Sequence, residues 1–223
     1  MKTEKLKPKL GEGVYTAPDA SIILDIPQYK IRRWIAKYWE MDFYDFNVYT
    51  WGEGREKGFN FYTLMELIAV NSFREIGLSF RKIKKAHEIL SKLMNTPYPF
   101  ASSKLLGDKK NIFLDQDNVD LLGLDTQLQY SFKELITPYC IKIDFSTKTG
   151  LAKRYWPMGK QYSIVVDPNN SFGQPVIKGT NITVYSILNY INAGESLESI
   201  SRILEIDPKS VKDVLSFKTR LAA

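Results

Sequence analysis

The residue types that most often carry chemistry are scarce in this chain of 223 residues, which has a single histidine, His87, and a single cysteine, Cys140. One histidine excludes His-rich metal centres and argues against a Ser-His-Asp triad. One cysteine excludes a disulfide within the chain and any multi-cysteine zinc site. No carboxylate–histidine pattern surrounds His87, so we expect it at the surface or half-buried. Cys140 lies in an apolar run, so we expect a small core residue there.

Two short segments are similar to ligand-binding loops, but each lacks a required residue. The acidic run 115–120 has Asp120 where a calcium loop needs a glycine for its sharp turn. The segment 173–180 has the order Lys-Gly-Thr instead of Gly-Lys-Thr, and Pro175 removes a backbone amide that would bind phosphate. No nucleophile–base pair and no metal cluster remain. We therefore expect no enzyme, no metal site and no cofactor, although the sequence does not exclude an enzyme.

The net charge of +6 is unevenly distributed along the chain. Residues 1–100 hold 16 Lys and Arg against 12 Asp and Glu, whereas residues 161–223 hold six of each. Two basic clusters lie in the first part, at Lys30–Lys37 and at Arg81–Lys85. Such clusters are most often solvated helix faces, and polyanion binding is the more specific interpretation. Their spacing must decide between the two.

The first basic cluster lies in a pattern typical of a helix-turn-helix. Thr16 is a candidate N-cap for a first helix, which Pro27 ends because the residue before proline avoids the helical region. The second helix is predicted over residues 28–39. Its buried stripe recurs at helical spacing, and its basic residues lie on the other side. The apolar positions of that stripe are Ile31, Trp34, Ile35 and Tyr38.

Residues 43–61 alternate aromatic and polar types around a glycine-rich, basic segment, Gly52–Gly58. This pattern predicts a β-hairpin with a basic tip. Directly after a helix-turn-helix, such a hairpin is a wing. Stacking of single-stranded bases on the aromatic residues is the less favoured alternative, because the alternation fits hairpin packing better.

Cap signals predict the helices that follow. Thr63 and Glu66 have the spacing of a capping box for a helix over 64–75. Ser79 is the predicted cap of a helix over 80–94. Further along, the caps Ser196 and Asp207 open two helices that follow a helix over 184–191 and a strand over 164–166. The middle of the chain has weaker strand signals, at Ile112–Leu114, Gln127–Tyr130 and Tyr139–Ile143.

The predicted fold class is α+β. We expect a winged helix-turn-helix over 1–100, a β-rich connecting region over 101–160 and a three-helix, helix-turn-helix-like domain over 161–223. No apolar stretch approaches the roughly 20 residues of a membrane helix, and Met1–Leu10 lacks the apolar core of a secretory signal. These observations favour a cytoplasmic protein with no membrane partner.

The last quarter of the chain resembles a bacterial antitoxin family catalogued as domain of unknown function 433. The resemblance lies in Tyr162–Pro168, in the Gly-x-Pro-Val-Ile-x-Gly-Thr core at 173–180, and in Ala193–Ile200. That family occurs in VapB-like antitoxins, which are paired with PIN-type RNase toxins. The resemblance therefore implies a toxin partner, and we expect Lys218 or Arg220 to enter the acidic metal site of that toxin.

The first hundred residues resemble a MerR-type winged helix-turn-helix, through Tyr15–Ala20, Ile26–Trp34 and Gly77–Ile83. This resemblance and the basic clusters imply binding of double-stranded operator DNA by a homodimer. Arg and Gln near the start of a recognition helix suit bidentate contacts to guanine and adenine. The candidate DNA contacts are Gln28, Tyr29, Lys30, Arg32, Arg33 and Lys37 on the helix, with Arg55 and Lys57 on the wing.

Together these features predict an antitoxin that neutralises a PIN-like RNase and represses its own operator. One alternative is a stand-alone transcriptional regulator whose second half senses a ligand or forms a dimer. A third possibility is a protein-interaction adaptor whose helix-turn-helix elements no longer touch DNA. An antitoxin should rescue growth from a toxic neighbouring gene product, which distinguishes it from both alternatives.

Overall fold

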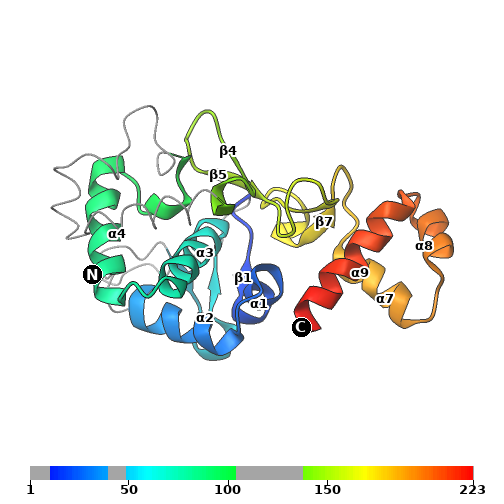
Figure 1. Ribbon diagram of the computed structural model, residues 1–223, viewed down its shortest axis with the longest axis horizontal. Coiled ribbons are helices and arrows are strands. Elements are labelled where there is room, and N and C mark those ends of the chain that lie inside the picture. Colours follow the sequence, from blue (N-terminus) through cyan, green and yellow to red (C-terminus); the bar gives the residue numbers. More distant parts are fainter. Residues whose placement is uncertain (1–10, 40–48, 104–137, 223) are drawn as a thin grey trace.

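The computed structural model describes residues 11–39, 49–103 and 138–222, and it has two lobes joined by a small sheet (Figure 1). The larger lobe holds α1–α4, and the smaller lobe is a bundle of α7, α8 and α9. Within the described ranges the fold combines helices with two small antiparallel sheets. It is therefore an α+β fold, in agreement with the predicted class. No helix in these ranges is long and apolar enough to cross a membrane.

The first helix, α1 (Ala17–Leu24), begins where its cap predicts. The hydroxyl of Thr16 accepts from the backbone N–H of Asp19, and the Asp19 carboxylate accepts from the N–H of Thr16, so the two residues form a capping box. The helix ends at Asp25, which has a left-handed backbone with φ of 59°. The chain then passes through Pro27 into α2 (Gln28–Trp34), as a helix-turn-helix requires.

The second helix is shorter as a regular α-helix than predicted. After Trp34 the backbone widens into a π-turn, Ile35–Trp39. Ile31, Trp34, Ile35 and Trp39 are all buried, so the predicted apolar stripe is confirmed as far as Ile35. Trp39, four residues after Ile35 at the end of the π-turn, is buried as well.

The predicted hairpin is present as β2 (Thr50–Trp51) and β3 (Gly58–Phe59), joined by a 3-10 turn at Gly54–Glu56. The pairing is antiparallel, with Thr50 opposite Phe59. A third strand, β1 (Tyr15–Thr16), pairs on the other side of β3, an addition that the sequence did not indicate. The aromatic residues at positions 43–48 lie outside the described residues.

The helix after the hairpin, α3 (Phe61–Glu75), begins three residues earlier than predicted. Its cap is Asn60, whose side chain accepts from the backbone N–H of Thr63. The predicted capping box is therefore wrong. Thr63 is buried and donates its hydroxyl to the carbonyl of Tyr49, because the helix start is packed under the hairpin.

Glu66, the other member of that predicted box, lies in the centre of the larger lobe. One carboxylate oxygen accepts from the backbone N–H of Phe100, and the other lies 2.8 Å from Nε2 of His87. Both side chains are almost completely buried. The expectation of a surface or half-buried His87 is wrong, because His87 lies on the buried face of α4 (Phe80–Met94), one turn from Ile83 and Leu90.

The second sheet has the order β4-β5-β6-β7, and every neighbouring pair is antiparallel. The strand predicted at Tyr139–Ile143 is wrong in its first half, because residues 138–140 are helical. Cys140 is buried, as predicted, and burial raises the pKa of its thiol to about 12. The candidates at 112–114, 115–120 and 127–130 lie outside the described residues. The strands are β4 (Ile143–Phe145), β5 (Ala152–Tyr155), β6 (Ile164–Val166) and β7 (Pro175–Ile177).

Side-chain caps begin the first two helices of the smaller lobe, and Asp207 lies directly before the third. The hydroxyls of Thr183 and Ser196 accept from backbone N–H groups in the first turns of α7 and α8. The carboxylate of Asp207 accepts from the N–H of Lys209 at the start of the last helix. The helices are α7 (Val184–Asn192), α8 (Leu197–Leu204) and α9 (Pro208–Ala222).

Strand β6 contributes to three separate apolar clusters. Val166 packs with the core of the larger lobe, Ile164 with the core of the α7–α9 bundle, and Val165 with Trp156 and Val176 on the opposite face of the sheet. Successive residues of a strand point to opposite faces, which separates Val165 from its neighbours. The sheet is thus packed into both lobes at once.

The buried carboxylate of Asp213, on α9, connects the α7–α9 bundle to the second sheet through hydrogen bonds. It accepts from the backbone N–H and the hydroxyl of Ser163, directly before β6, and pairs with Lys209 at 3.2 Å. Burial alone would raise the pKa of Asp213. The Ser163 hydrogen bonds and the charge of Lys209 outweigh it, so the pKa lies below its ordinary value.

A depressed carboxyl pKa stabilises the folded state above the unfolded-state value of about 3.9, and this contribution is lost as the pH falls through the folded-state pKa. We expect Asp213→Asn to lower the urea midpoint at pH 7 and to have a smaller effect at pH 3. The control is Glu198→Gln, which changes an exposed carboxylate of α8 and should leave the pH profile unchanged. An equal loss for Asp213→Asn at both pH values would contradict this account.

Candidate functional site

The helix α2 has one buried and one exposed face. Ile31 and Trp34 point into the core, and the Trp34 ring lies 6.1 Å from the ring of Phe80 at the start of α4. This contact fixes α2 against the rest of the lobe. The opposite face carries predicted DNA contacts that are exposed to solvent: Gln28, Tyr29, Arg32, Arg33 and Lys37, with Lys30 half-buried beside them.

Arg32 and Arg33 have no hydrogen-bond or ion-pair partner within the described residues. A guanidinium presents several N–H donors in a planar fork that matches phosphate oxygens or the edge of guanine. An arginine held on a helix without an intramolecular partner keeps those donors available. Tyr29 is 68% exposed on the same face, so this side of α2 offers both cationic and aromatic groups.

Of the two DNA contacts predicted on the hairpin between β2 and β3, only Lys57 has a side chain among the described residues. Lys57 lies directly before β3 and is half-buried. Arg55 lies in the 3-10 turn Gly54–Glu56, and its side chain is outside the described part. The turn depends on Gly52, whose φ is +76° and whose Cβ would lie 2.9 Å from the carbonyl oxygen of Glu56. We therefore expect side chains at position 52 to distort the wing.

The second basic run extends from the same corner of the lobe. Arg81, Lys82 and Lys85 are exposed on α4, directly after Phe80, whose ring contacts α2. The sequence identified this run without assigning it a role. Because Phe80 contacts Trp34, the start of α4 lies beside the C-terminal end of α2.

The two predicted toxin contacts have different environments. Lys218 is exposed on α9 and donates to the side-chain oxygen of Asn192 at 2.9 Å. Arg220 instead points at the larger lobe. Its guanidinium donates to the carbonyl oxygens of Ile22, Ile23 and Pro157 at 3.1–3.2 Å. A toxin contact by Arg220 would require this group to leave three carbonyl oxygens, whereas Lys218 would give up one amide.

Arg220 lies at the C-terminal end of α1, where unpaired carbonyl groups carry partial negative charge and favour a cation. Its Nε is 3.9 Å from the carboxylate of Asp25, and the guanidinium lies 4.7 Å above the Phe217 ring. Burial lowers the pKa of Arg220, while Tyr155 and Asp25 act in the opposite direction. The last helix is thereby attached to α1, the helix that precedes α2.

We expect Arg220→Ala to lower the free energy of unfolding by about 1–3 kcal/mol, because several charge-assisted hydrogen bonds are lost. Limited proteolysis should also cut between the lobes more quickly. The control is Lys218→Ala, which removes a neighbouring exposed cation and should change stability by less than about 0.5 kcal/mol. Equal effects of the two variants would contradict a structural role for Arg220.

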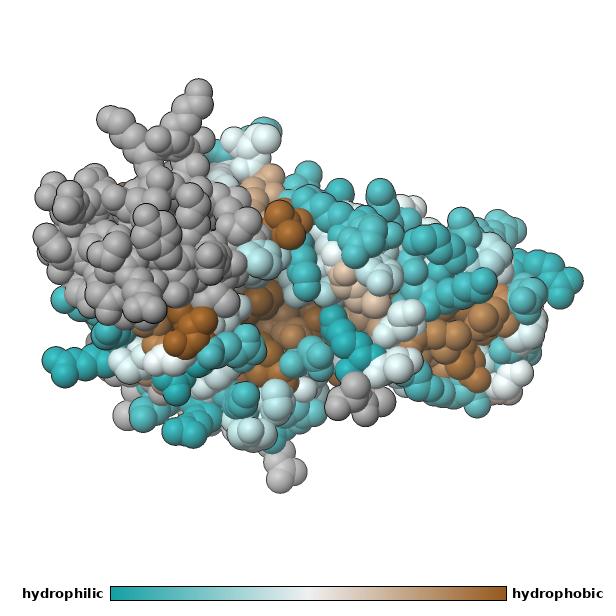
Figure 2. Space-filling view, viewed as in Figure 1, coloured by the Kyte–Doolittle hydropathy of each residue, from teal (hydrophilic) through white to brown (hydrophobic). Residues whose placement is uncertain are grey.

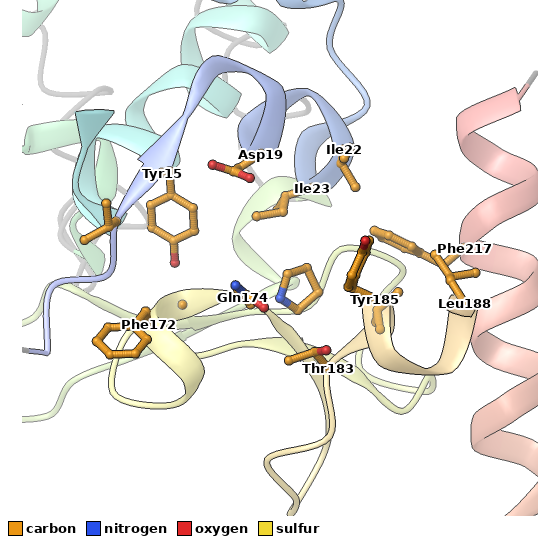
Figure 3. A pocket seen from close by; sticks show the side chains of 14 residues that line it. Tyr15, Asp19, Ile22, Ile23, Phe172, Gln174, Thr183, Tyr185, Leu188 and Phe217 are labelled. Carbon is orange, nitrogen blue, oxygen red and sulfur yellow. The ribbon is translucent and has the colours of Figure 1, made fainter. Parts of the chain in front are cut away.

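A cavity of about 390 Å³ lies between the lobes, close to the Arg220 contact, and the sequence did not indicate it. It is bounded by α1 and β1 on one side and by the turn before β7 and the helix α7 on the other (Figure 3). Among the described residues, no group of three His, Cys, Asp or Glu side chains could hold a metal ion.

Comparison with known proteins places part of the chain in a described family. Residues 164–217 match the family model "Protein of unknown function (DUF433)". The smaller lobe is a DUF433 domain. The match begins at the first residue of β6 and ends in α9, so it covers the α7–α9 bundle and two strands of the second sheet.

Two further comparisons extend over most of the chain. It is 25% identical over 166 residues to the "Putative antitoxin VapB45" of Mycobacterium tuberculosis, a match that covers 70% of this chain and 69% of the relative. The crystal structure of Rv2018 from Mycobacterium tuberculosis has the same fold, with a TM-score of 0.69 and 21% identity over 90% of this chain and 96% of that one. The chain is thus a distant homologue of a protein named as an antitoxin, and the shared fold extends well beyond the DUF433 domain.

Proposed function

We propose that this protein is an antitoxin that binds operator DNA through α2 and its wing and neutralises an RNase toxin. The observation that carries the DNA-binding part is the uncovered face of α2, where Arg32 and Arg33 have no partner within the described residues. The named relative supports the antitoxin part. We further propose that the protein binds palindromic DNA as a homodimer, because a two-fold dimer matches two half-sites.

The proposed DNA surface includes three parts of the larger lobe. The exposed face of α2 enters the major groove, Lys57 and Arg55 of the wing contact the neighbouring backbone, and the start of α4 adds phosphate contacts. If several cations contact phosphates, affinity falls steeply as salt increases, with a slope of about 0.9 for each phosphate contact. A slope equivalent to four or more contacts is expected here.

The toxin is proposed to bind the smaller lobe, with Lys218 as the more accessible of the two predicted contacts. Its exposed position on α9 lets it reach an acidic active site after giving up one hydrogen bond. Arg220 joins it only if binding releases the contact with α1. In that case toxin binding would loosen the attachment of α9 to the helix-turn-helix.

One experiment tests both parts of this proposal. The gene is co-expressed with the neighbouring open reading frame, and growth, co-purification and binding to the upstream DNA across salt concentrations are measured. We expect rescue of growth, a stable complex and a steep salt dependence. Failure to rescue combined with salt-dependent operator binding would favour the stand-alone regulator, and rescue without DNA binding would favour a protein-binding role alone.

A further inference from the structure

The cavity between the lobes has an unusually apolar rim. Its lining includes four of the large apolar residues that are exposed in the described part of the chain, and Phe172 and Tyr185 are the most exposed of them, at 71% and 70%. Figure 2 shows apolar surface on the smaller lobe and between the lobes on this face of the molecule. Exposed apolar groups that converge on a cavity mark a binding site more often than single exposed residues do. The other two are Val14 and Ile22.

The backbone at the rim holds an aromatic side chain outward at a conformational cost. Ser171 and Phe172 both have left-handed backbones, with φ of 46° and 55°. Non-glycine residues rarely adopt this conformation, and such residues concentrate at ligand-binding and catalytic sites. The carbonyl of Phe172 accepts from the N–H of Val14 at 3.1 Å. This hydrogen bond joins the two lobes at the edge of the cavity.

Few polar groups line the cavity, and two of them, on Asp19 and Tyr15, are distinctive. Asp19 is the single charged residue among the fourteen that line it. Tyr15 extends from β1 toward the turn that holds Phe172 and Gln174 (Figure 3). Its hydroxyl is buried without a hydrogen-bond partner within the described residues. Gly173 permits this position, because a Cβ there would collide with the hydroxyl. Buried polar groups are normally paired, so an unpaired hydroxyl beside the cavity is unusual.

From this geometry we propose that the cavity binds a small apolar molecule that carries one amino group. A volume of about 390 Å³ is at the lower end of the range for ligand sites, which fits a single ring with a short chain. The apolar part contacts Ile22, Val184 and Leu188, while the ammonium group lies near Asp19. Exposed aromatic rings at the rim favour a cation further, since their faces attract positive charge.

A ligand in this position contacts both lobes. Ile22 and Ile23 belong to α1, which leads into the recognition helix, and Leu188 and Phe217 belong to the DUF433 domain. The carbonyl oxygens of Ile22 and Ile23 are also the groups that hold Arg220. Binding therefore stabilises the contact between the lobes, independently of whether a toxin or DNA is present.

The test uses the full chain, without DNA or toxin, and three probes that differ only in their end group: 4-phenylbutylamine, 4-phenylbutanol and 4-phenylbutanoate. Binding is measured by calorimetry and by the shift in thermal unfolding. We expect the amine to bind about five- to tenfold more tightly than the alcohol, and the carboxylate to bind more weakly than either. Equal binding of all three, or no binding at millimolar concentrations, overturns the proposal.

Two variants locate the binding site. Ile22→Trp fills the cavity from its rim and should abolish binding of all three probes. The control is Ile203→Trp, at an exposed position on α8, which should leave probe binding unchanged. Asp19→Asn retains an oxygen that can accept the Thr16 bond and should remove the preference for the amine while leaving the alcohol bound. Circular dichroism verifies that each variant folds. Probe binding that survives Ile22→Trp overturns the proposal, as does a concentration-dependent dimer that Ile22→Trp disrupts, since a second copy would then occupy this surface.

Discussion

Replacing Arg32 and Arg33 together by Ala should lower the affinity of the protein for its operator about 100-fold at 0.1 M salt, while its fold remains intact. Each good base contact by arginine contributes roughly 1–3 kcal/mol of discrimination, and each phosphate contact adds a salt-dependent contribution. Both side chains are exposed and lack partners within the described residues, so their removal breaks no internal contact. The variant therefore separates DNA binding from folding.

The measurement is fluorescence anisotropy with the upstream duplex and with a random duplex, at several salt concentrations. The slope of log affinity against log salt should become shallower by up to roughly 2. A double variant of Lys153 and Lys212 to Ala removes the same charge from exposed positions on β5 and α9 and should have a much smaller effect. Equal losses in the two double variants would show that net charge, and not α2, determines binding.

The second large effect concerns the buried pair of Glu66 and His87. Replacement of Glu66 by Ala leaves the backbone N–H of Phe100 without its acceptor and removes the carboxylate that lies 2.8 Å from Nε2 of His87 in the core of the larger lobe. Buried polar groups that lose their partner cost about 1–3 kcal/mol each, and disruption of a buried pair costs about 3–5 kcal/mol. We expect Glu66→Ala to lower the free energy of unfolding by at least about 3 kcal/mol.

Urea unfolding followed by circular dichroism measures this loss. Glu66→Gln keeps an oxygen for the Phe100 N–H and an amide near His87, so it should lose much less stability than Glu66→Ala. Glu75→Ala makes the same substitution at an exposed position of α3 and should change the stability by less than about 0.5 kcal/mol. A loss of less than 1 kcal/mol in Glu66→Ala would show that the core does not depend on this pair.

Local signals in the sequence predicted most of the helix starts. A cap such as Thr16, Ser79 or Ser196 acts on N–H groups within three residues, so a short window of sequence contains its whole effect. Proline at position 27 ended a helix for an equally local reason. The failure at Thr63 has a tertiary cause, since Asn60 competes for the same role and the hairpin occupies the Thr63 hydroxyl.

The contacts that the sequence did not reveal join distant segments. Glu66 and His87 lie on different helices, and Arg220 is almost 200 residues from the carbonyl groups that it binds. No periodic pattern records such pairs. For His87 the sequence does contain a signal, because it lies one turn from Ile83 and Leu90 on the buried face of α4. The exposed face of α2 was predictable because its amphipathic spacing is regular.

The division of β6 among three clusters has a consequence for how this chain can be cut. The DUF433 match begins at Ile164, but β6 pairs with β5 on one side and with β7 on the other. A fragment that starts at this boundary would lose the pairing of Val166 with Tyr155 and would expose Val166, which packs in the core of the larger lobe. Open edges invite pairing with other chains and aggregation. We therefore expect a fragment that also contains β5 and β4 to be more soluble than one that begins at Ile164, so the boundary of the family match need not be the best place to cut the chain.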